Sequence, residues 1–497
     1  MREIITAQDI RLAHPNNCVC QTDGYYIRFA NNLYDRLRGF VGKDFPDKNF
    51  TKVLACKLTC YFEDIVADMG VWHMFSDACM KLYGFPVPMY HAEEEYYPDE
   101  PSLNAVRYLV WDVACELFPD RLFRTDSLLL EMGQEAYRIL DAAFESAPIN
   151  EEGKAEMNNM LQYAGQGFTE LREVLGWVLA GCYITSGHWL NEDMRAKAKV
   201  INSIPVFKQM ATSMRQYFIL SEMKFDNRIG PLALLPYEWL RLLAETTGNS
   251  DVAKLLGEIK VQEMDTYKYD PDSDEDPMTL ENTRGKVIKV NRKELNLKPE
   301  IIKANNACVA SFVFYKGAWR LNGVVVPALL KDGEFESFKD DHAKSHKKSL
   351  SADELLQKTD GRRLVFFKDA DEMKHYLLEK VKFPANIAEN KALSALEAPC
   401  MFIDTEAKGE VEFFAPMIEH SIKSPDNPYY DAEKAKEDAV NILWNSNVTS
   451  TNLANYLIEQ GLLPDAETSS VFSQESTHEQ RLGDMNFFMR TSRRRLY

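Results

Sequence analysis

The spacing of the apolar residues changes near residue 260, and this change limits what the chain can fold into. Up to about residue 258 apolar side chains recur at helical spacing, as in 102–118 and 168–184. Beyond an acidic, proline-bearing stretch at 265–278 the period becomes two, which is the repeat of a β-strand. The chain of 497 residues is also too long for a single hydrophobic core. The pattern therefore predicts an α+β protein with several domains.

We expect four segments along the chain. A large helical domain covers 1–258. A small β-rich domain is assigned to 259–345, and the acidic stretch 265–278 near its start is expected to be the linker that precedes its strands. A small α/β unit covers 346–425, and a C-terminal helical segment with a basic end covers 426–497.

Local signals predict where several hairpins and helices begin. Hairpins are expected at 279–291 and 308–326, where Arg284-Gly285 and Lys316-Gly317 supply the tight turns, and at 401–416, which turns at Lys408-Gly409. Helix starts are expected at Ser102, at Pro236, and at Asp369 or Asp371.

Charge and cysteine usage suggest where the protein works and what it binds. A net charge of −18 disfavours nucleic acid and anionic lipid as partners. The one basic cluster is Arg490 with Arg493, Arg494 and Arg495 at the C-terminal end. The cysteines are scattered, there is no signal-peptide pattern, and no apolar run approaches the roughly 18 residues of a membrane helix. We expect a soluble, cytoplasmic protein with a possible protein partner and no evident cofactor, although a divalent cation is possible; the oligomeric state is left open.

Acidic and histidine side chains gather between residues 61 and 100. We expect one long helix over roughly 50–82 with Trp72 buried. On such a helix Asp64 and Asp68 repel each other unless a cation or a basic group lies between them. A divalent-cation site would also draw on the loop at 90–100. The candidate residues are Glu63, Asp64, Asp68, His91, Glu93, Glu94 and Glu95. The interpretation that the pattern favours is that these acids are solvated or have structural partners.

A second candidate lies near the N-terminus. His14, Cys18 and Cys20 form an H-x3-C-x-C pattern, and zinc prefers such ligands. No second C-x-C and no paired histidine completes a set of four ligands by sequence. The sequence therefore favours ordinary packing and turn roles for these residues and keeps zinc binding as the alternative.

Several segments are distinctive as a set. They are TDGYYIRFANNLYDRL (22–37), YFEDIVADMGVWHMF (61–75), YYPDE (96–100), ELREVLGWVLAGCYI (170–184), IGPLALLPYEWLRLL (229–243), NPYYDAEKA (427–435) and YLIEQGLLPD (456–465). On these segments the chain resembles an uncharacterised bacterial protein family of unknown function, typical of gut anaerobes. Because the segments span nearly the whole chain, the resemblance is to a complete protein. It implies no reaction and no catalytic residues.

Two functional classes stay open. No dinucleotide fingerprint, phosphate-binding loop, H-E-x-x-H motif or G-x-S-x-G motif occurs. This favours a binding or regulatory protein that presents interaction surfaces. The alternative is a metal-assisted hydrolase with a carboxylate and histidine site between the 61–75 helix and the 90–100 loop. Whether the chain is an enzyme at all is not decided by the sequence.

Overall fold

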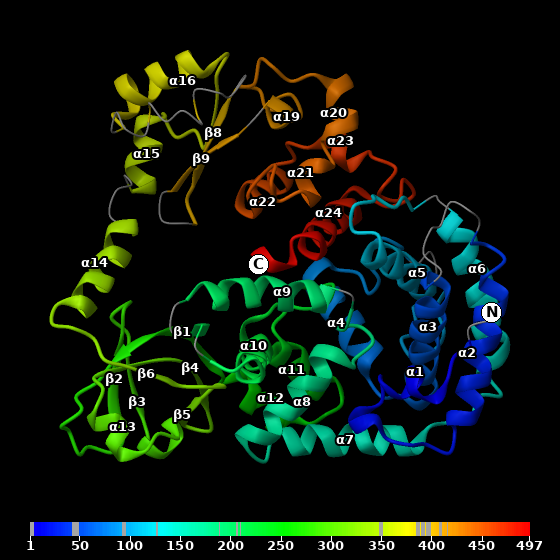
Figure 1. Cartoon of the computed structure of the whole chain (residues 1–497). Helices are drawn as coiled ribbons and strands as arrows, with labels where there is room; N and C mark the ends of the chain where they lie inside the picture. The colour runs from blue at the N-terminus through cyan, green and yellow to red at the C-terminus, as the bar shows by residue number, and fades with distance from the viewer. Residues whose placement is uncertain are drawn as a thin grey trace. The chain divides into compact units, whose positions relative to one another are not determined.

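The computed structural model confirms a mostly helical α+β fold with two small antiparallel sheets (Figure 1). It describes residues 4–41, 49–91, 96–125, 128–187, 189–204, 207–208, 210–346, 351–383, 388, 393, 399–406, 410–414 and 416–497. Contacts divide the chain into two compact units, one made of 1–123 with 127–344 and the other of 124–126 with 345–497. The four segments expected from the sequence are a finer division, which stays a prediction.

Helices form the first unit up to residue 257. They are α1 (Ala7–Arg11), η1 (Pro15–Asn17), α2 (Asp23–Leu37), α3 (Phe50–Ala67), α4 (Val71–Tyr83), α5 (Leu103–Leu117), α6 (Leu128–Phe144), α7 (Glu151–Ala164), α8 (Phe168–Ala180), α9 (Trp189–Ser203), α10 (Thr212–Asp226), α11 (Pro236–Thr246) and α12 (Ser250–Gly257). The predicted starts of two helices are confirmed. The Ser102 hydroxyl accepts a hydrogen bond from the Ala105 N–H at 3.3 Å, and Pro236 begins α11.

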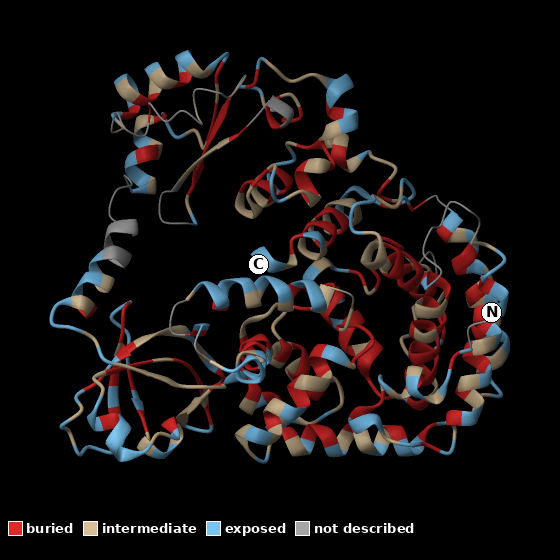
Figure 2. Ribbon diagram, viewed as in Figure 1, coloured by how far each residue is buried: buried red, intermediate tan, exposed pale blue. Residues whose placement is uncertain are grey.

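Helix α3 lies at the centre of the helical core. It packs against α2, α5 and α7, and Figure 2 shows it buried along most of its length. Its neighbour α4 carries Trp72, whose side chain is only 1% exposed, which confirms the prediction that this residue is buried.

The prediction of a single helix over 50–82 is wrong, because the structure has two helices, α3 and α4, with a break between them. Asp68 and Gly70 adopt left-handed backbone conformations with φ of 51° and 91°. Glycine reaches that region without strain, whereas a helix cannot continue through it. The break sends α4 in a new direction, so side chains before and after it no longer share one helical face.

The first unit ends in a six-stranded antiparallel sheet of order β3-β2-β1-β4-β5, with β6 also paired to β4. The strands are β1 (Lys260–Lys268), β2 (Met278–Asn282), β3 (Val287–Val290), β4 (Ala307–Tyr315), β5 (Ala318–Leu321) and β6 (Val326–Ala328); η3 (Arg292–Leu295), α13 (Pro299–Lys303) and α14 (Glu334–His346) accompany them. The predicted hairpins at 279–291 and 308–326 are confirmed as β2–β3 and β4–β5. Gly285 and Gly317 occupy their turns with φ of 77° and 74°.

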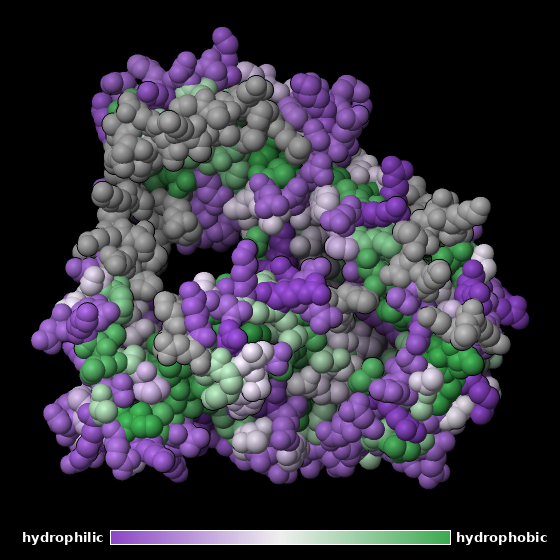
Figure 3. All heavy atoms as spheres, in the orientation of Figure 1, coloured by the Kyte–Doolittle hydropathy of each residue, from purple (hydrophilic) through white to green (hydrophobic). Residues whose placement is uncertain are grey.

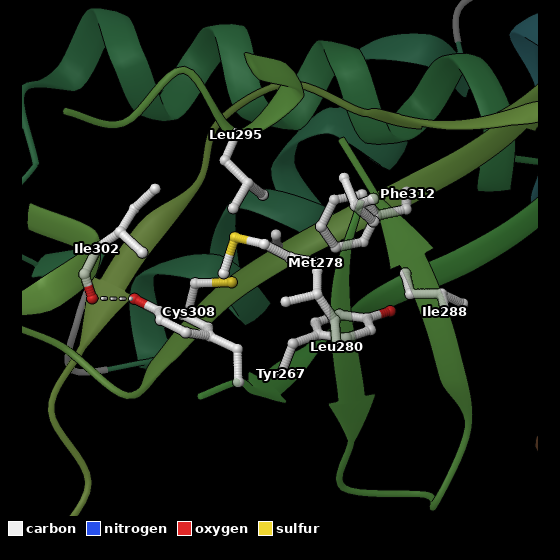
Figure 4. Close-up of a cluster of buried hydrophobic side chains, with 11 residues drawn as sticks. Tyr267, Met278, Leu280, Ile288, Leu295, Ile302, Cys308 and Phe312 are labelled. Carbon is white, nitrogen blue, oxygen red and sulfur yellow. Dashed lines mark hydrogen bonds between the residues drawn. The ribbon is translucent and has the colours of Figure 1, made fainter. Parts of the chain in front are cut away.

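The stretch 265–278 is not a linker over its whole length, because its first residues belong to β1. This strand lies between β2 and β4, and its backbone pairs with both. Backbone pairing on both sides stabilises β1 although many of its side chains are polar. A search for alternating apolar side chains therefore does not detect this strand. Tyr267 from β1 joins a buried cluster in which side chains of four strands point toward one another, including Leu280, Ile288 and Phe312 (Figure 4).

A buried polar contact joins the sheet to the helices within the first unit. The Oε1 atom of Glu222 on α10 accepts hydrogen bonds from the Ser311 hydroxyl on β4 and from the Asn322 amide, the latter at 3.1 Å. The Tyr315 hydroxyl donates to the Ala164 carbonyl at 2.8 Å. Because Glu222 is only 3% exposed, burial raises its pKa to about 8, and the nearby Asp226 carboxylate adds to that rise.

The second unit has a three-stranded antiparallel sheet of order β7-β8-β9 and a set of short helices. Its strands are β7 (Leu364–Phe366), β8 (Cys400–Asp404) and β9 (Glu410–Phe414). Its helices are α15 (Ala352–Lys358), α16 (Ala370–Tyr376), η4 (Leu377–Val381), α19 (Pro416–Glu419), α20 (Ala432–Asp438), α21 (Asn441–Trp444), α22 (Thr451–Glu459), α23 (Pro464–Glu467), α24 (His478–Ser492) and η5 (Arg494–Leu496). Of the two predicted caps, Asp369 starts α16 by accepting from the Glu372 N–H at 2.9 Å. The predicted turn at Lys408-Gly409 lies outside the described residues.

One arginine of the basic C-terminal cluster has a structural role. Arg493 is 2% exposed, and its guanidinium donates to the carbonyls of Leu443 and Thr449 at 2.7 Å each. The guanidinium thereby supplies hydrogen-bond donors to carbonyl groups beside α21 that would otherwise be buried without a partner. The Arg490 guanidinium lies over the Tyr497 ring, 4.8 Å from its centre. Arg493 is therefore not accessible to an anionic partner.

Among the described residues, no helix combines the length and the apolar character that crossing a bilayer requires. On the face drawn in Figure 3, hydrophobic side chains form separate patches among hydrophilic ones.

The buried Glu222 predicts a pH-dependent stability. Its pKa in the folded protein lies above the ordinary value of 4.5, so stability decreases as the pH rises from about 4.5 through about 8, by at most roughly 1.4 kcal/mol per pH unit. Glu222→Gln mimics the protonated form and should remove this slope. The measurement is denaturant unfolding at several pH values, with Glu300→Gln as control because Glu300 is exposed on α13 and is not among the groups that shift the pKa of Glu222. A variant whose pH profile runs parallel to that of the wild type would contradict the assignment.

Candidate metal centre

A tight turn brings His14, Cys18 and Cys20 together between α1 and α2. Asn16 and Asn17 lie in the turn η1 with φ of 52° and 51°, a left-handed conformation that asparagine tolerates better than most residues. The chain reverses there, and the Cys18 N–H donates to the carbonyl of Pro15 at 3.1 Å. The reversal places both cysteines beside the histidine that precedes the turn.

The three side chains offer ligand atoms to one point. His14 Nδ1, Cys18 Sγ and Cys20 Sγ all lie within 4.8 Å of one another. The two sulfur atoms are 3.6 Å apart, and the Cys20 sulfur lies 3.9 Å from His14 Nδ1. A disulfide would need a sulfur separation of about 2.05 Å, so both thiols are free. The H-x3-C-x-C pattern is therefore a cluster in space as well as in sequence.

Two of these separations, 3.6 Å between the sulfur atoms and 3.9 Å between the Cys20 sulfur and His14 Nδ1, are close to those of a tetrahedral zinc site. Zinc binds thiolate sulfur at about 2.3 Å and imidazole nitrogen at about 2.0–2.1 Å, which sets neighbouring ligand atoms about 3.4–3.8 Å apart. Thiolate and imidazole ligands together select zinc over magnesium or calcium, which prefer oxygen. His14 and Cys20 are 3% and 5% exposed, and Cys18 is half-buried.

The other ring nitrogen of His14 is held by a buried carboxylate. His14 Nε2 lies 2.9 Å from Glu63 Oε2 on α3. The second oxygen of Glu63 accepts from the Asn150 amide at 2.7 Å, and Asn150 caps α7 by accepting from the Gly153 N–H at 2.9 Å. A carboxylate behind a histidine fixes the ring and its tautomer in many metal sites. Nδ1 lies on the other side of the ring, 3.3 Å from the Cys18 carbonyl oxygen and 3.9 Å from the Cys20 sulfur. A metal ion at Nδ1 would replace the contact with that carbonyl.

The protonation of these side chains sets a requirement for metal binding. Burial alone lowers the pKa of His14, but hydrogen bonds with Cys18 and Glu63 outweigh it and raise the pKa to about 10. Burial is also the main cause that raises the pKa of Cys20 to about 12. A metal ion binds the thiolate and the neutral imidazole at Nδ1, so binding displaces protons from the cluster.

Asp64 serves the fold rather than an open site. Its oxygen atoms accept from the N–H groups of Val71 and Trp72 at 3.1 and 2.6 Å, and from the Tyr183 hydroxyl at 2.7 Å. The carboxylate therefore caps α4 across the break after α3. Burial raises the pKa of Asp64, and these three donors oppose that rise.

The other acidic and histidine candidates have separate surroundings among the described residues. Asp68 pairs with Lys154 at 2.9 Å, and its side chain is 60% exposed. The His91 ring packs edge-on against Phe85 with ring centres 4.4 Å apart, and its carbonyl accepts from Asn104 at 2.7 Å. Glu93, Glu94 and Glu95 lie outside the described residues. A joint site of these groups stays a prediction, and the described contacts give Glu63, Asp64 and Asp68 structural partners.

Fold and cluster together define a mostly helical α+β protein with a candidate structural metal centre near its N-terminus. The chain belongs to the family described as "Protein of unknown function (DUF3843)", whose model matches residues 5–289 and 325–492. The match covers most of the chain, which confirms the resemblance to an uncharacterised whole-chain family. Neither the curated proteins nor the solved structures contain a match.

The spacing of His14, Cys18 and Cys20 signals the cluster in the sequence, whereas its supporting residues carry no such signal. Glu63 and Asn150 are separated from their partners by 49 and 87 positions. A carboxylate in the middle of an apolar helix is the only hint for Glu63, because such a group must find a buried donor.

The structural role of Asp64 is testable by substitution. Asp64→Asn places an NH2 group against the donors at Val71, Trp72 or Tyr183, and should lower the free energy of unfolding by about 2–4 kcal/mol. Asp68→Asn is the control, because an exposed ion pair contributes at most about 1 kcal/mol. Denaturant unfolding with and without EDTA gives both values. A loss at Asp64 that appears only in the presence of divalent cations would instead favour a metal role for this residue.

Proposed function

We propose that this chain is a zinc-binding protein in which His14, Cys18 and Cys20 hold the ion. The observation that carries the proposal is the meeting of one imidazole nitrogen and two thiol sulfur atoms within 4.8 Å. The carboxylate of Glu63 behind His14 supports it further, since zinc-bound histidines usually donate their second N–H to such a group.

The zinc would stabilise structure. Two of its ligands are almost fully buried, so a bound ion has little contact with solvent. Structural zinc sites contribute directly to folding free energy because the unfolded chain does not hold the ligands together. In this protein the ion would fix the connector between α1 and α2, residues 12–22, against the helical core.

The wider role that we propose is that of a binding or regulatory protein that presents interaction surfaces. The metal-assisted hydrolase is the weaker alternative. It requires carboxylates that are free to hold a catalytic ion, whereas Glu63 and Asp64 already accept hydrogen bonds inside the core. A hydrolase also requires an open coordination position on the metal for water. The burial of Glu63 and Asp64 disfavours such a position at these two residues.

Metal analysis of the full-length protein tests the proposal. Protein purified without chelator should contain about one zinc ion per chain. Cys18→Ser with Cys20→Ser should lose the ion and the rise in melting temperature that zinc gives the wild type. Cys56→Ser is the matched control, since Cys56 is a half-buried cysteine on α3 outside the cluster.

Zinc-free wild-type protein that also fails to take up added zinc would overturn the proposal. An unchanged zinc content in the double variant would do the same. Thiol titration distinguishes zinc binding from a redox role. A disulfide between Cys18 and Cys20 in freshly purified protein would identify the pair as a redox site.

A further inference from the structure

The carboxylate of Asp23 lies beside the cluster of His14, Cys18 and Cys20. Asp23 is the first residue of α2 and follows Cys20 by three positions. Its side chain is 8% exposed, and its Oδ1 atom lies 4.0 Å from His14 Nδ1. Among the described residues this oxygen accepts no hydrogen bond. A buried carboxylate oxygen without a donor is costly unless a cation lies beside it.

The second oxygen of Asp23 is fully engaged. Arg11 contacts Oδ2 through Nε at 2.6 Å and through Nη2 at 2.5 Å. The guanidinium holds the carboxylate from one side, so the remaining oxygen is the one that lies near His14 Nδ1. Asp23 is not in the set of ligand atoms that lie within 4.8 Å of one another, so coordination requires its side chain to shift toward the sulfur atoms. Arg11 is thus a positioning residue for Asp23.

We propose that Asp23 is the fourth zinc ligand, through Oδ1, and that it closes the coordination shell. The proposal rests on the proposed function, because it needs zinc at His14, Cys18 and Cys20. The segment then reads H-x3-C-x-C-x2-D, and all four ligands come from ten consecutive residues. Carboxylate oxygen binds zinc at about 2.0–2.2 Å, and structural zinc is almost always four-coordinate.

Arg11 offsets part of the negative charge of such a site. Two thiolates and one carboxylate exceed the charge of Zn²⁺ by one negative charge, and the Arg11 guanidinium in contact with Asp23 offsets it. An unbalanced charge in a buried site would carry a large desolvation cost. The buried Glu63 carboxylate behind His14 adds one further negative charge, which hydrogen bonds from the His14 ring and the Asn150 amide stabilise. A closed, four-coordinate site has no position for an activated water, so it stabilises the fold and performs no hydrolysis.

Substitution of Asp23 tests the proposal on the full-length protein. Asp23→Asn should weaken Zn²⁺ binding in a chelator competition by at least about tenfold. With Co²⁺ as the probe, it should also change the visible spectrum of a tetrahedral site. Asp35→Asn is the matched control, because Asp35 lies on the same helix with its side chain exposed, and it should leave both readouts unchanged.

A ligand exchange separates coordination from the ion pair with Arg11. Asp23→Cys removes the ion pair but supplies a third thiolate, so it should still bind Co²⁺ in a tetrahedral site, with a stronger sulfur-to-metal charge-transfer band. This variant keeps the test decisive should Asp23→Asn fail to fold. If Asp23 serves only Arg11, then Asp23→Asn destabilises the protein equally with zinc and with EDTA, and Asp23→Cys gains no charge-transfer intensity.

The outcomes separate this proposal from the proposed function. Wild-type protein that binds neither Zn²⁺ nor Co²⁺ would overturn both. Wild-type protein that binds zinc while Asp23→Asn keeps the same affinity and the same Co²⁺ spectrum would overturn only the role of Asp23. Loss of affinity in Asp23→Asn together with the new sulfur band in Asp23→Cys is the result that we expect.

Discussion

The buried contact between His14 and Glu63 is the interaction on which the N-terminal arrangement depends. It joins the connector after α1 to α3, and Asn150 extends it to the start of α7. Each group in this chain of contacts is buried, so removing one leaves its partner without a hydrogen bond in the core, at a cost of about 1–3 kcal/mol or more. The same contact orients the imidazole toward the side on which the two sulfur atoms lie, and this orientation is the basis of the proposed metal site.

The connector is also held to the helices behind it. The Trp177 ring N–H on α8 donates to the Ala13 carbonyl at 3.2 Å, and the Gln21 N–H donates to Glu152 on α7 at 2.6 Å. A metal ion in the cluster would therefore couple α1 and α2 to a surface that the rest of the first unit has already formed. If the proposed ion binds, the stability of this region would therefore depend on the metal concentration.

The acidic residues on α3 show how far a sequence pattern can be interpreted. Periodicity correctly predicts the helical part, the two hairpins of the first unit and the burial of Trp72, because these follow from spacing and from glycine turns. It misses the break at Asp68 and Gly70 and the polar strand β1, because both depend on contacts with distant partners. Glu63, Asp64 and Asp68 look alike in the sequence, yet one binds a histidine, one caps a helix and one forms an exposed ion pair.

X-ray absorption at the zinc edge, on full-length protein purified without chelator, tests the central claim most directly. We expect a four-coordinate ion with two sulfur neighbours at about 2.3 Å and two nitrogen or oxygen neighbours at about 2.0–2.2 Å, one of them an imidazole. Bound zinc surrounded by nitrogen and oxygen alone would contradict the claim, because it would show that Cys18 and Cys20 are not ligands.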